Sequence, residues 1–138
     1  PVPVREDVQM IKGIDWILCP TDSFGETVAF VRNVLDLVPG ASGVPVTDPQ
    51  FVRYAQFTLP DRTTLEIVEP TAAARPHYLG PVVCLTVDDL AGARAELARK
   101  SAEFVTPVIT AGDGWGWTYL RAPGGQVFQL QGPWSAPG

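Results

Sequence analysis

The sequence predicts an α+β fold of two tandem βαβββ modules, which form a curled mixed sheet around a central cleft with one helix behind each module. Three observations predict it: two hairpin-like segments align without a gap, a strand and a helix precede each, and an Ala/Pro-rich segment separates them. We expect a single domain over 1–138, with module one at 13–70, a linker at 71–80 and module two at 81–133.

The aligned segments are YAQFTLPDRTTLEIVEP at 54–70 and WTYLRAPGGQVFQLQGP at 117–133. Both open on an aromatic residue, and the turn prolines Pro60 and Pro123 fall in register, as do the closing prolines Pro70 and Pro133. A strand, a tight turn with Pro, Asp or Gly, and a second strand is the pattern of a β-hairpin. Each module therefore ends in a hairpin.

The segments before the hairpins are also alike. WILCPTDSF at 16–24 matches VVCLTVDDL at 82–90, and each apolar run leads into a helical pattern. Asp88 or Asp89 is placed to cap the second helix. The apolar residues that recur at helical spacing are Phe24, Val28, Val31 and Leu35 in the first copy, and Leu90, Ala93, Leu97 and Ala98 in the second. We expect a short strand between helix and hairpin, at Val44–Thr47 and at Phe104–Ile109.

The composition excludes several classes of protein. Apolar residues make up 46% of the chain and charged residues 18%, which favours a packed core over disorder. The net charge is −5 with no Lys/Arg cluster, so we expect no nucleic-acid partner. No apolar run has the ~20 residues of a membrane span. Cys19 and Cys84 lie in apolar runs and predict buried thiols, and the expected location is the cytoplasm.

The chain resembles the vicinal oxygen chelate superfamily, which includes glyoxalase I, extradiol dioxygenases, fosfomycin-resistance enzymes and bleomycin-binding proteins. The residues that carry the likeness are WILCPTDSFGETVAFVRNVLDL (16–37), TVDDLAGARAEL (86–97) and YLRAPGGQVFQLQG (119–132). The resemblance implies the paired fold, a ligand cleft and a homodimer. Metal-using members take ligands, usually His, Glu or Gln, from the first and last strand of each half.

Carried onto this chain, the four ligand positions are Trp16, Glu66, Val82 and Gln129. Only Glu66 and Gln129 can coordinate a metal ion, which is too few for the near-octahedral site of Ni²⁺, Mn²⁺ or Fe²⁺. Asp15 is expected on the opposite strand face. The resemblance therefore implies a cleft without a tightly held catalytic metal, and we expect no cofactor.

Strand alternation extends the cleft face from these four positions. The side chains expected there are Trp16, Leu18, Tyr54, Gln56, Thr58, Thr64, Glu66, Val68, Val82, Cys84, Thr86, Trp117, Tyr119, Arg121, Val127, Gln129 and Gln131. The opposite face is apolar and should pack against the helices. It contains Ile17, Phe57, Leu65, Ile67, Val83, Leu85, Leu120, Phe128 and Leu130.

The cleft is expected to be aromatic with a few polar groups, the mixture of a small-molecule site. The candidate ligand-binding residues are Trp16, Tyr54, Gln56, Glu66, Trp115, Trp117, Tyr119, Arg121 and Gln129. Arg121 could clamp a carboxylate or pair with Glu66. The segment TAGDGWG at 110–116 is either a movable flap carrying Trp115 or an ordinary connection. His77, the one histidine, is expected to be an exposed linker residue.

Three functions remain open. The first is a metal-independent protein that binds an aromatic or hydrophobic small molecule, similar to bleomycin-resistance proteins. The second is a metal-independent isomerase, cyclase or lyase in which Glu66, with a pKa raised by an apolar cleft, is the catalytic base. The third is a metal-dependent lyase or dioxygenase with a different ligand set.

Overall fold

The computed structural model describes residues 9–136, which contain two α-helices, a short 3₁₀ helix and nine strands. The elements in chain order are β1 (Ile11–Pro20), α1 (Phe24–Asn33), β2 (Pro39–Gly43), β3 (Phe51–Thr58), β4 (Thr64–Pro70), η2 (Arg75–His77), β5 (Val82–Val87), α2 (Leu90–Arg99), β6 (Glu103–Phe104), β7 (Ile109–Thr110), β8 (Trp115–Arg121) and β9 (Val127–Pro133). The α+β class is confirmed, while the expected curling of the sheet stays a prediction.

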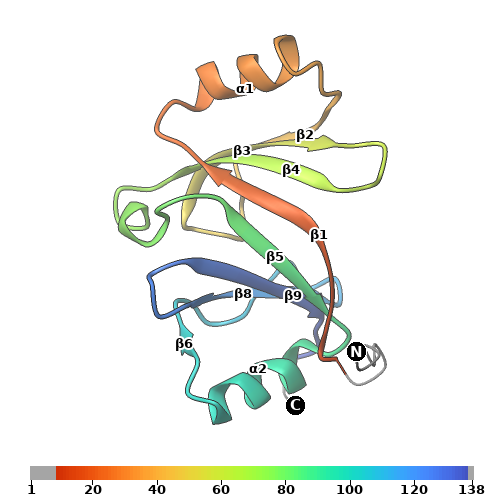
Figure 1. The fold of residues 1–138 in the computed structure, drawn as a ribbon, viewed down its shortest axis with the longest axis vertical. Helices are drawn as coiled ribbons and strands as arrows, with labels where there is room; N and C mark the ends of the chain where they lie inside the picture. Colours follow the sequence, from red (N-terminus) through yellow and green to blue (C-terminus); the bar gives the residue numbers. More distant parts are fainter. Residues whose placement is uncertain (1–8, 137–138) are drawn as a thin grey trace, which may run out of the picture.

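All the strands belong to one mixed sheet, in the order β2-β3-β4-β1-β5-β9-β8-β6, with β7 also paired to β8. The first strands of the two halves, β1 and β5, pair antiparallel in the middle. Each also pairs parallel with the last strand of its own half, β1 with β4 and β5 with β9. The two halves therefore have matching strand orders on either side of the β1–β5 pair, as Figure 1 shows.

The two predicted hairpins have the same turn geometry. Arg62 in the first turn and Gly125 in the second both have a positive φ, of 71° and 92°. The amide of Arg62 donates to the carbonyl of Leu59, and the amide of Gly125 donates to the carbonyl of Ala122, at 2.9 Å each. Since 62 and 125 are equivalent in the gapless alignment, the repeat seen in the sequence extends to the backbone.

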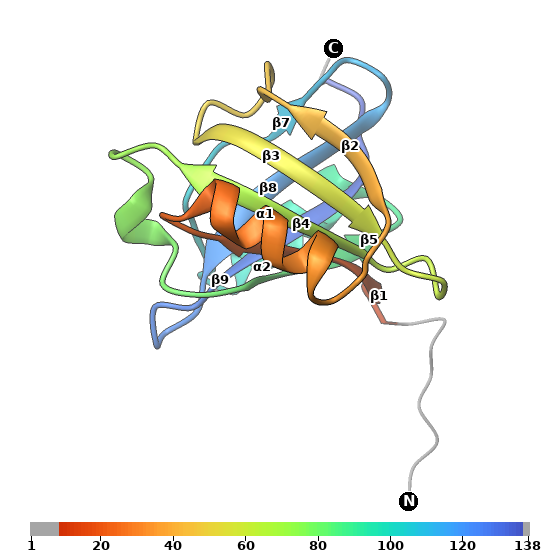
Figure 2. The same ribbon diagram turned by 90° about the horizontal axis from the view of Figure 1, so that it is seen from above.

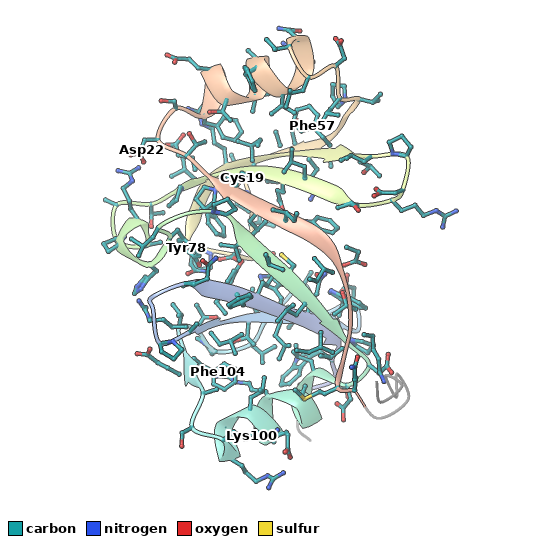
Figure 3. The ribbon with its side chains drawn as sticks, in the orientation of Figure 1. Cys19, Asp22, Phe57, Tyr78, Lys100 and Phe104 are labelled. Carbon is teal, nitrogen blue, oxygen red and sulfur yellow. The ribbon has the colours of Figure 1, made fainter. Side chains whose placement is uncertain are left out.

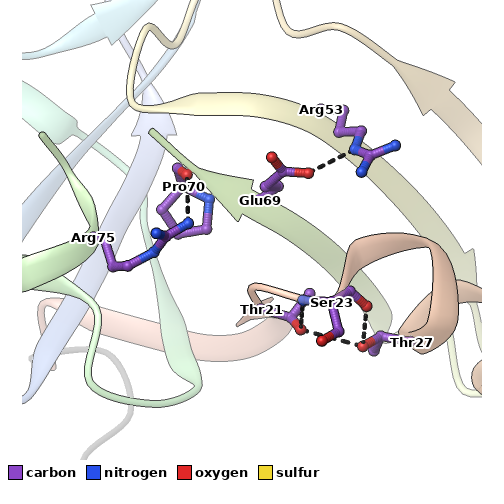
Figure 4. Close-up of polar contacts among 7 residues, drawn as sticks. All are labelled: Thr21, Ser23, Thr27, Arg53, Glu69, Pro70 and Arg75. Atoms are coloured by element: carbon purple, nitrogen blue, oxygen red, sulfur yellow. Dashed lines mark hydrogen bonds and ion pairs between the residues drawn. The ribbon is translucent and has the colours of Figure 1, made fainter. Parts of the chain in front are cut away.

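Helix α1 covers the outer face of β3 and β4 (Figure 2), where Val31 packs against Phe57 and Ile67. Phe57 is labelled in Figure 3, between the helix and the strands. The start of α1 is held by threonines: Thr21 Oγ1 accepts from the amide of Ser23 at 2.9 Å, and Thr27 Oγ1 donates to the carbonyl of Ser23 at 2.7 Å (Figure 4). Such side-chain bonds satisfy groups that a helix end leaves unpaired.

Helix α2 covers the corresponding face of the second half. Leu90 and Ala93 pack there against Leu130, with Leu85 beside them. The side chain of Asp89 accepts from the amide of Gly92, which confirms the predicted N-cap. Apolar strand residues thus pack against a helix in each half. Leu35 and Ala98, predicted to pack with them, are instead exposed, because α1 ends at Asn33 and Ala98 lies on the solvent side of α2.

The short strand of the first half was predicted in the wrong place, and that of the second half was predicted as continuous but is interrupted. In the first half β2 lies at Pro39–Gly43, and residues 44–47 form a loop. In the second half the run 104–109 is broken into β6 and β7. Each predicted strand contained a proline, Pro45 or Pro107, which has no N–H to donate to a neighbouring strand. Within residues 9–136 no helix has the length and hydropathy needed to cross a membrane.

Substitution of Gly132 should destabilise the fold. A Cβ built at this residue of β9 would collide with the backbone carbonyl oxygen of Val87, which a small shift of a flexible side chain cannot relieve. We expect Gly132→Ala to lower the free energy of unfolding by about 1–3 kcal/mol, the usual cost of overpacking. Urea denaturation checks this. Gly124→Ala is the matched control, since its Cβ would meet no atom within 4 Å; an equal loss in both variants would contradict the account.

Candidate functional site

A cavity of about 420 Å³ lies on the sheet face opposite the helices and takes its walls from both halves. Module one contributes β1, the loop before β3, β3 and β4, and module two contributes β8 and β9. The lining residues are Trp16, Leu18, Val44, Pro45, Val46, Thr47, Asp48, Phe51, Tyr54, Gln56, Glu66, Val68, Trp115, Trp117, Tyr119, Gln129 and Gln131. The walls are mainly aromatic and aliphatic, with two carboxylates and three amides.

Glu66 on β4 is the first carboxylate of the cavity. Its Oε1 accepts from the indole Nε1 of Trp16 at 2.8 Å, and its Oε2 accepts from the amide of Gln56 at 3.4 Å. Burial raises the pKa of Glu66 above its ordinary value; the two hydrogen bonds oppose this, and the charge of Asp48 adds to it. Glu66 is therefore a carboxyl group that holds a proton up to a higher pH than an exposed glutamate does.

Asp48 is the second carboxylate, and it connects the two halves. Its Oδ2 accepts from the indole Nε1 of Trp117 at 3.0 Å and from the hydroxyl of Tyr119 at 2.9 Å, both on β8. Its Oδ1 accepts from the backbone amide and the side-chain amide of Gln50, each at 3.2 Å. Asp48 is only 5% exposed, so four hydrogen bonds compensate the burial of its charge.

The hydrogen-bond network around Asp48 continues into the aromatic core. The Tyr78 hydroxyl donates to Oε1 of Gln50 at 2.5 Å, and Gln129 donates its amide to the hydroxyl of Tyr119 at 3.2 Å. The rings of Tyr78, Phe51 and Tyr119 lie 5.4–6.4 Å apart in tilted or edge-on pairs. Burial is the main cause that raises the pKa of both tyrosines, so each hydroxyl keeps its proton and remains a donor. This cluster fixes one wall of the cavity.

Eight of the nine residues predicted to bind ligand do line the cavity: Trp16, Tyr54, Gln56, Glu66, Trp115, Trp117, Tyr119 and Gln129. They come from five strands: the resemblance implied Trp16, Glu66 and Gln129, period-two alternation added Tyr54, Gln56, Trp117 and Tyr119, and the glycine-rich segment suggested Trp115. Their role in binding stays a prediction. Trp115 lies at the cavity with 37% of its surface exposed, between Gly112 and Gly116 in the glycine-rich segment that was predicted as a flap or a connection.

Arg121 is the exception, and its expected pairing with Glu66 is wrong. Its Nη2 lies 2.7 Å from Nδ1 of His77, and its Nε lies 3.3 Å from a carboxylate oxygen of Glu103. Arg121 is the last residue of β8 and pairs across the sheet with Glu103 of β6. The prediction that His77 is exposed is also wrong, because the helix η2 folds its ring against Arg121 and leaves it partly buried.

Strand alternation held on β5, where Val82 and Cys84 pack in the cluster that contains Leu18 and Tyr119 of the cavity wall, but it failed on β1 near Asp15. A register shift between Ile14 and Trp16 interrupts the β1–β5 pairing, and Asp15 accepts from Thr86 at 3.0 Å and from Gln131 at 3.2 Å. Asp15 therefore shares the side of the sheet from which it was expected to be absent. Val82 and Cys84 are buried in the core beneath the cavity and do not line it. Thr58, Thr64, Thr86 and Val127, which were also expected at the cleft, are not among the lining residues.

The sequence reasoning missed Asp48, Phe51 and the loop at 44–47. An Asp-Pro pair is a turn signal, and Asp48 does accept from the amide two residues on, as in an Asx turn. That signal could have located the turn. It could not have shown that the carboxylate is buried against β8, since its partners at 117 and 119 lie about 70 residues away in the sequence.

The four positions that correspond to metal ligands do not fit a metal centre. The indole of Trp16 donates to the Glu66 carboxylate, and the Gln129 amide nitrogen is bonded to Tyr119. Val82 is 1% exposed and has no donor atom. The set offers one carboxylate and one amide oxygen, too few for a transition-metal site. Among residues 9–136 no three His, Cys, Asp or Glu side chains are grouped to hold a metal ion.

Comparisons with known proteins agree with the paired fold. The family model of the Glyoxalase/Bleomycin resistance protein/Dioxygenase superfamily matches residues 13–130, and the chain belongs to this superfamily. No curated protein matches it significantly. The fold is similar to methylmalonyl-CoA epimerase from Mycobacterium tuberculosis, with a TM-score of 0.71 and 17% identity over 94% of this chain and 92% of that one.

Two further solved structures have the same fold. A Streptomyces coelicolor methylmalonyl-CoA epimerase variant in complex with 2-nitronate-propionyl-CoA has a TM-score of 0.67 and 19% identity, over 91% of this chain and 99% of that one. A Legionella pneumophila protein described as an NAD-dependent benzaldehyde dehydrogenase has a TM-score of 0.59 and 15% identity, over 86% and 98%. Identities this low establish a shared fold and leave the activity open.

Loss of the Asp48 carboxylate should destabilise the protein. Asp48→Ala leaves the donors of Trp117, Tyr119 and Gln50 without an acceptor, so we expect the free energy of unfolding to fall by about 2–4 kcal/mol, with loss of the near-ultraviolet circular dichroism of the cleft aromatics. Urea denaturation measures the first. Asp22→Ala is the control; Asp22 is 70% exposed and pairs with Arg75, so its loss should cost below about 1 kcal/mol. A loss for Asp48→Ala as small as that of the control would contradict the role assigned to Asp48.

Proposed function

We propose that this protein binds a small, largely apolar or aromatic molecule in the cleft, without a metal ion. The observation that carries the proposal is the cavity of about 420 Å³, walled by aromatic side chains from both modules. Its size falls in the range of small-molecule sites, roughly 300–1,000 Å³, and a mainly apolar lining with a few convergent polar groups is typical of them.

The aromatic side chains are suited to a flat ligand. Trp117 and Tyr119 are held in place by Asp48, and Trp16 is held by Glu66, so these three rings are oriented before a ligand arrives. Ordered side chains lose little conformational entropy on binding, which raises the affinity that a given contact area supplies. A ring stacked against one of them gains about 0.5–1.5 kcal/mol beyond the burial of its surface.

The charges in the cavity do not favour the acyl-CoA ligands named for the epimerases of similar fold. A carboxylate or phosphate group needs positive or hydrogen-bond-donating partners. Of the described residues that line this cavity, none is Lys, Arg or His, whereas Asp48 and Glu66 are acidic. The proposal of a metal-independent binder therefore rests on the cavity of this chain and not on the ligands of those epimerases. Homodimerisation, implied by the family, stays a prediction.

A second candidate is a metal-independent isomerase, cyclase or lyase that uses Glu66 as its base. The observation in its favour is the pKa of Glu66, which burial raises. A carboxylate with a raised pKa is a stronger base than an exposed one, so it takes a proton from a substrate more readily. Turnover of a bound compound that is abolished in Glu66→Gln, while binding persists, would distinguish this enzyme from a binder.

Binding should depend on Trp115. We expect 2-naphthylmethanol, a neutral planar probe, to bind the protein, and Trp115→Ala to raise its dissociation constant about three- to tenfold through loss of one aromatic contact. Isothermal titration calorimetry measures this. Phe30→Ala is the control, because Phe30 is an exposed aromatic residue of α1 outside the cavity. Failure of the probe to bind, or equal weakening in both variants, would contradict the proposal.

A further inference from the structure

The hydrogen-bond donors in the cavity are largely committed to the protein itself. The indole N–H groups of Trp16 and Trp117 donate to Glu66 and Asp48, and the hydroxyl of Tyr119 donates to Asp48 as well. The side-chain amides are also engaged as donors: Gln56 with Glu66, Gln129 with Tyr119, and Gln131 with Asp15 and Thr86. Among the described residues, the Tyr54 hydroxyl and the Trp115 indole N–H have no such bond, so the cavity offers a ligand these two donors as well as acceptor atoms.

Glu66 has acceptor capacity to spare. Each oxygen of a carboxylate can accept two hydrogen bonds. Oε1 of Glu66 has one strong partner, Trp16, and Oε2 has one long bond of 3.4 Å from Gln56. Asp48, by contrast, accepts two bonds on each oxygen and has no capacity left. Glu66 is therefore the carboxylate that a ligand can reach as a partner.

The negative charge of these two carboxylates is not cancelled by a cation within the cavity. The hydrogen-bond donors to Asp48 and Glu66 are indoles, a hydroxyl and amides, all of them neutral. None of the described cavity residues is a Lys, Arg or His. Charges in a part-buried cleft with apolar walls are weakly screened, so the cavity has a negative potential. That potential attracts a positively charged ligand and disfavours an anion.

The aromatic walls of the cavity also attract a positively charged ligand. Trp16, Tyr54, Trp115 and Trp117 line the same cavity as Glu66. The face of an aromatic ring carries negative charge density, and a cation within about 6 Å of its centre is stabilised. Tryptophan gives a stronger interaction of this kind than tyrosine or phenylalanine. Aromatic faces around a carboxylate are a combination that favours organic cations over metal ions, since the rings offer no lone pair.

We propose that the natural ligand is an organic cation, a protonated amine or amidine on a flat apolar body, with its N–H groups donating to Glu66 and the rest of the molecule against the tryptophans. This inference rests on the proposed function and specifies its ligand class. Asp48 contributes its charge and holds Trp117 and Tyr119 in place, and Glu66 makes the direct contact.

Three probes of one shape test the charge: 2-naphthylmethylamine, a cation at neutral pH; 2-naphthylmethanol, which is neutral; and 2-naphthoate, an anion. Isothermal titration calorimetry gives each dissociation constant. We expect the amine to bind at least about tenfold more tightly than the alcohol, as a charge-assisted hydrogen bond in a cleft provides, and the naphthoate to bind most weakly.

Glu66→Gln keeps the size of the side chain and an oxygen that can accept from Trp16. It should remove the preference for the amine, because the amine loses a charge-assisted hydrogen bond and the alcohol at most a neutral one. Glu69→Gln is the matched control on the same strand; Glu69 pairs with Arg53 on the side away from the cavity (Figure 4), so this variant should keep the preference. On the unmutated protein, lowering the pH protonates Glu66 and should weaken binding of the amine more than binding of the alcohol.

The outcomes separate the two proposals. If the alcohol binds as tightly as the amine, or if the amine's advantage survives in Glu66→Gln and at low pH, the charge assignment is overturned while the binding function stands. If none of the three probes binds, the proposed function is overturned and the ligand class with it. Loss of the amine's advantage in both Glu66→Gln and Glu69→Gln would also overturn the assignment. The preference for the cation would then come from the overall negative charge of the protein and not from a contact with Glu66.

Discussion

The rest of the site depends on the contact between the Asp48 carboxylate and strand β8. Asp48 comes from the loop before β3 in module one, and its Oδ2 holds Trp117 and Tyr119 of module two. Its Oδ1 holds Gln50, whose side chain in turn accepts from Tyr78 in the linker. A buried charge is costly unless it is fully hydrogen-bonded, and here each of its bonds fixes a wall of the cavity. The same interaction therefore joins the modules and shapes the space between them.

Glu66 is the second carboxylate of the cavity, and its oxygens, unlike those of Asp48, can accept further hydrogen bonds. It lies at a position where metal-using members of the superfamily have a ligand, and here its partner is the indole of Trp16, itself at another ligand position. An indole N–H occupies only one acceptor position of the carboxylate, whereas a metal ion would hold the carboxylate as its ligand. The oxygen atoms stay available to a ligand with N–H or O–H groups, and the raised pKa keeps the proton exchangeable.

The sequence predicted most of the architecture because the information was local and repeated. The hairpin alignment placed Arg62 and Gly125 at equivalent turn positions, and both have positive φ. Starting from the ligand positions that the family resemblance implied, period-two alternation placed Tyr54, Gln56 and Trp117 on the cavity side. The turn positions and the alternation of side chains along a strand are both set by local backbone geometry, so they can be predicted from the sequence.

The predictions that were wrong share one cause. Each depended on a long-range contact or on a local irregularity of a strand, which a short sequence pattern does not encode. Pro45 and Pro107 interrupt runs that looked like strands, and a register shift near Asp15 turns its side chain toward Thr86. Arg121 was placed in the cleft by alternation, but at the end of β8 it meets His77 of the linker. The role of Asp48 depends on residues far along the chain, so only the folded arrangement reveals it.

The central claim is that this cleft holds an organic ligand and no metal ion. Native mass spectrometry with elemental analysis, on protein purified without chelator, tests it most directly. The account predicts no stoichiometric metal and, where a natural ligand is retained, a small organic adduct that denaturation releases. Near-stoichiometric Ni, Mn, Fe or Zn, lost in Glu66→Ala, would contradict it and would make Glu66 a metal ligand.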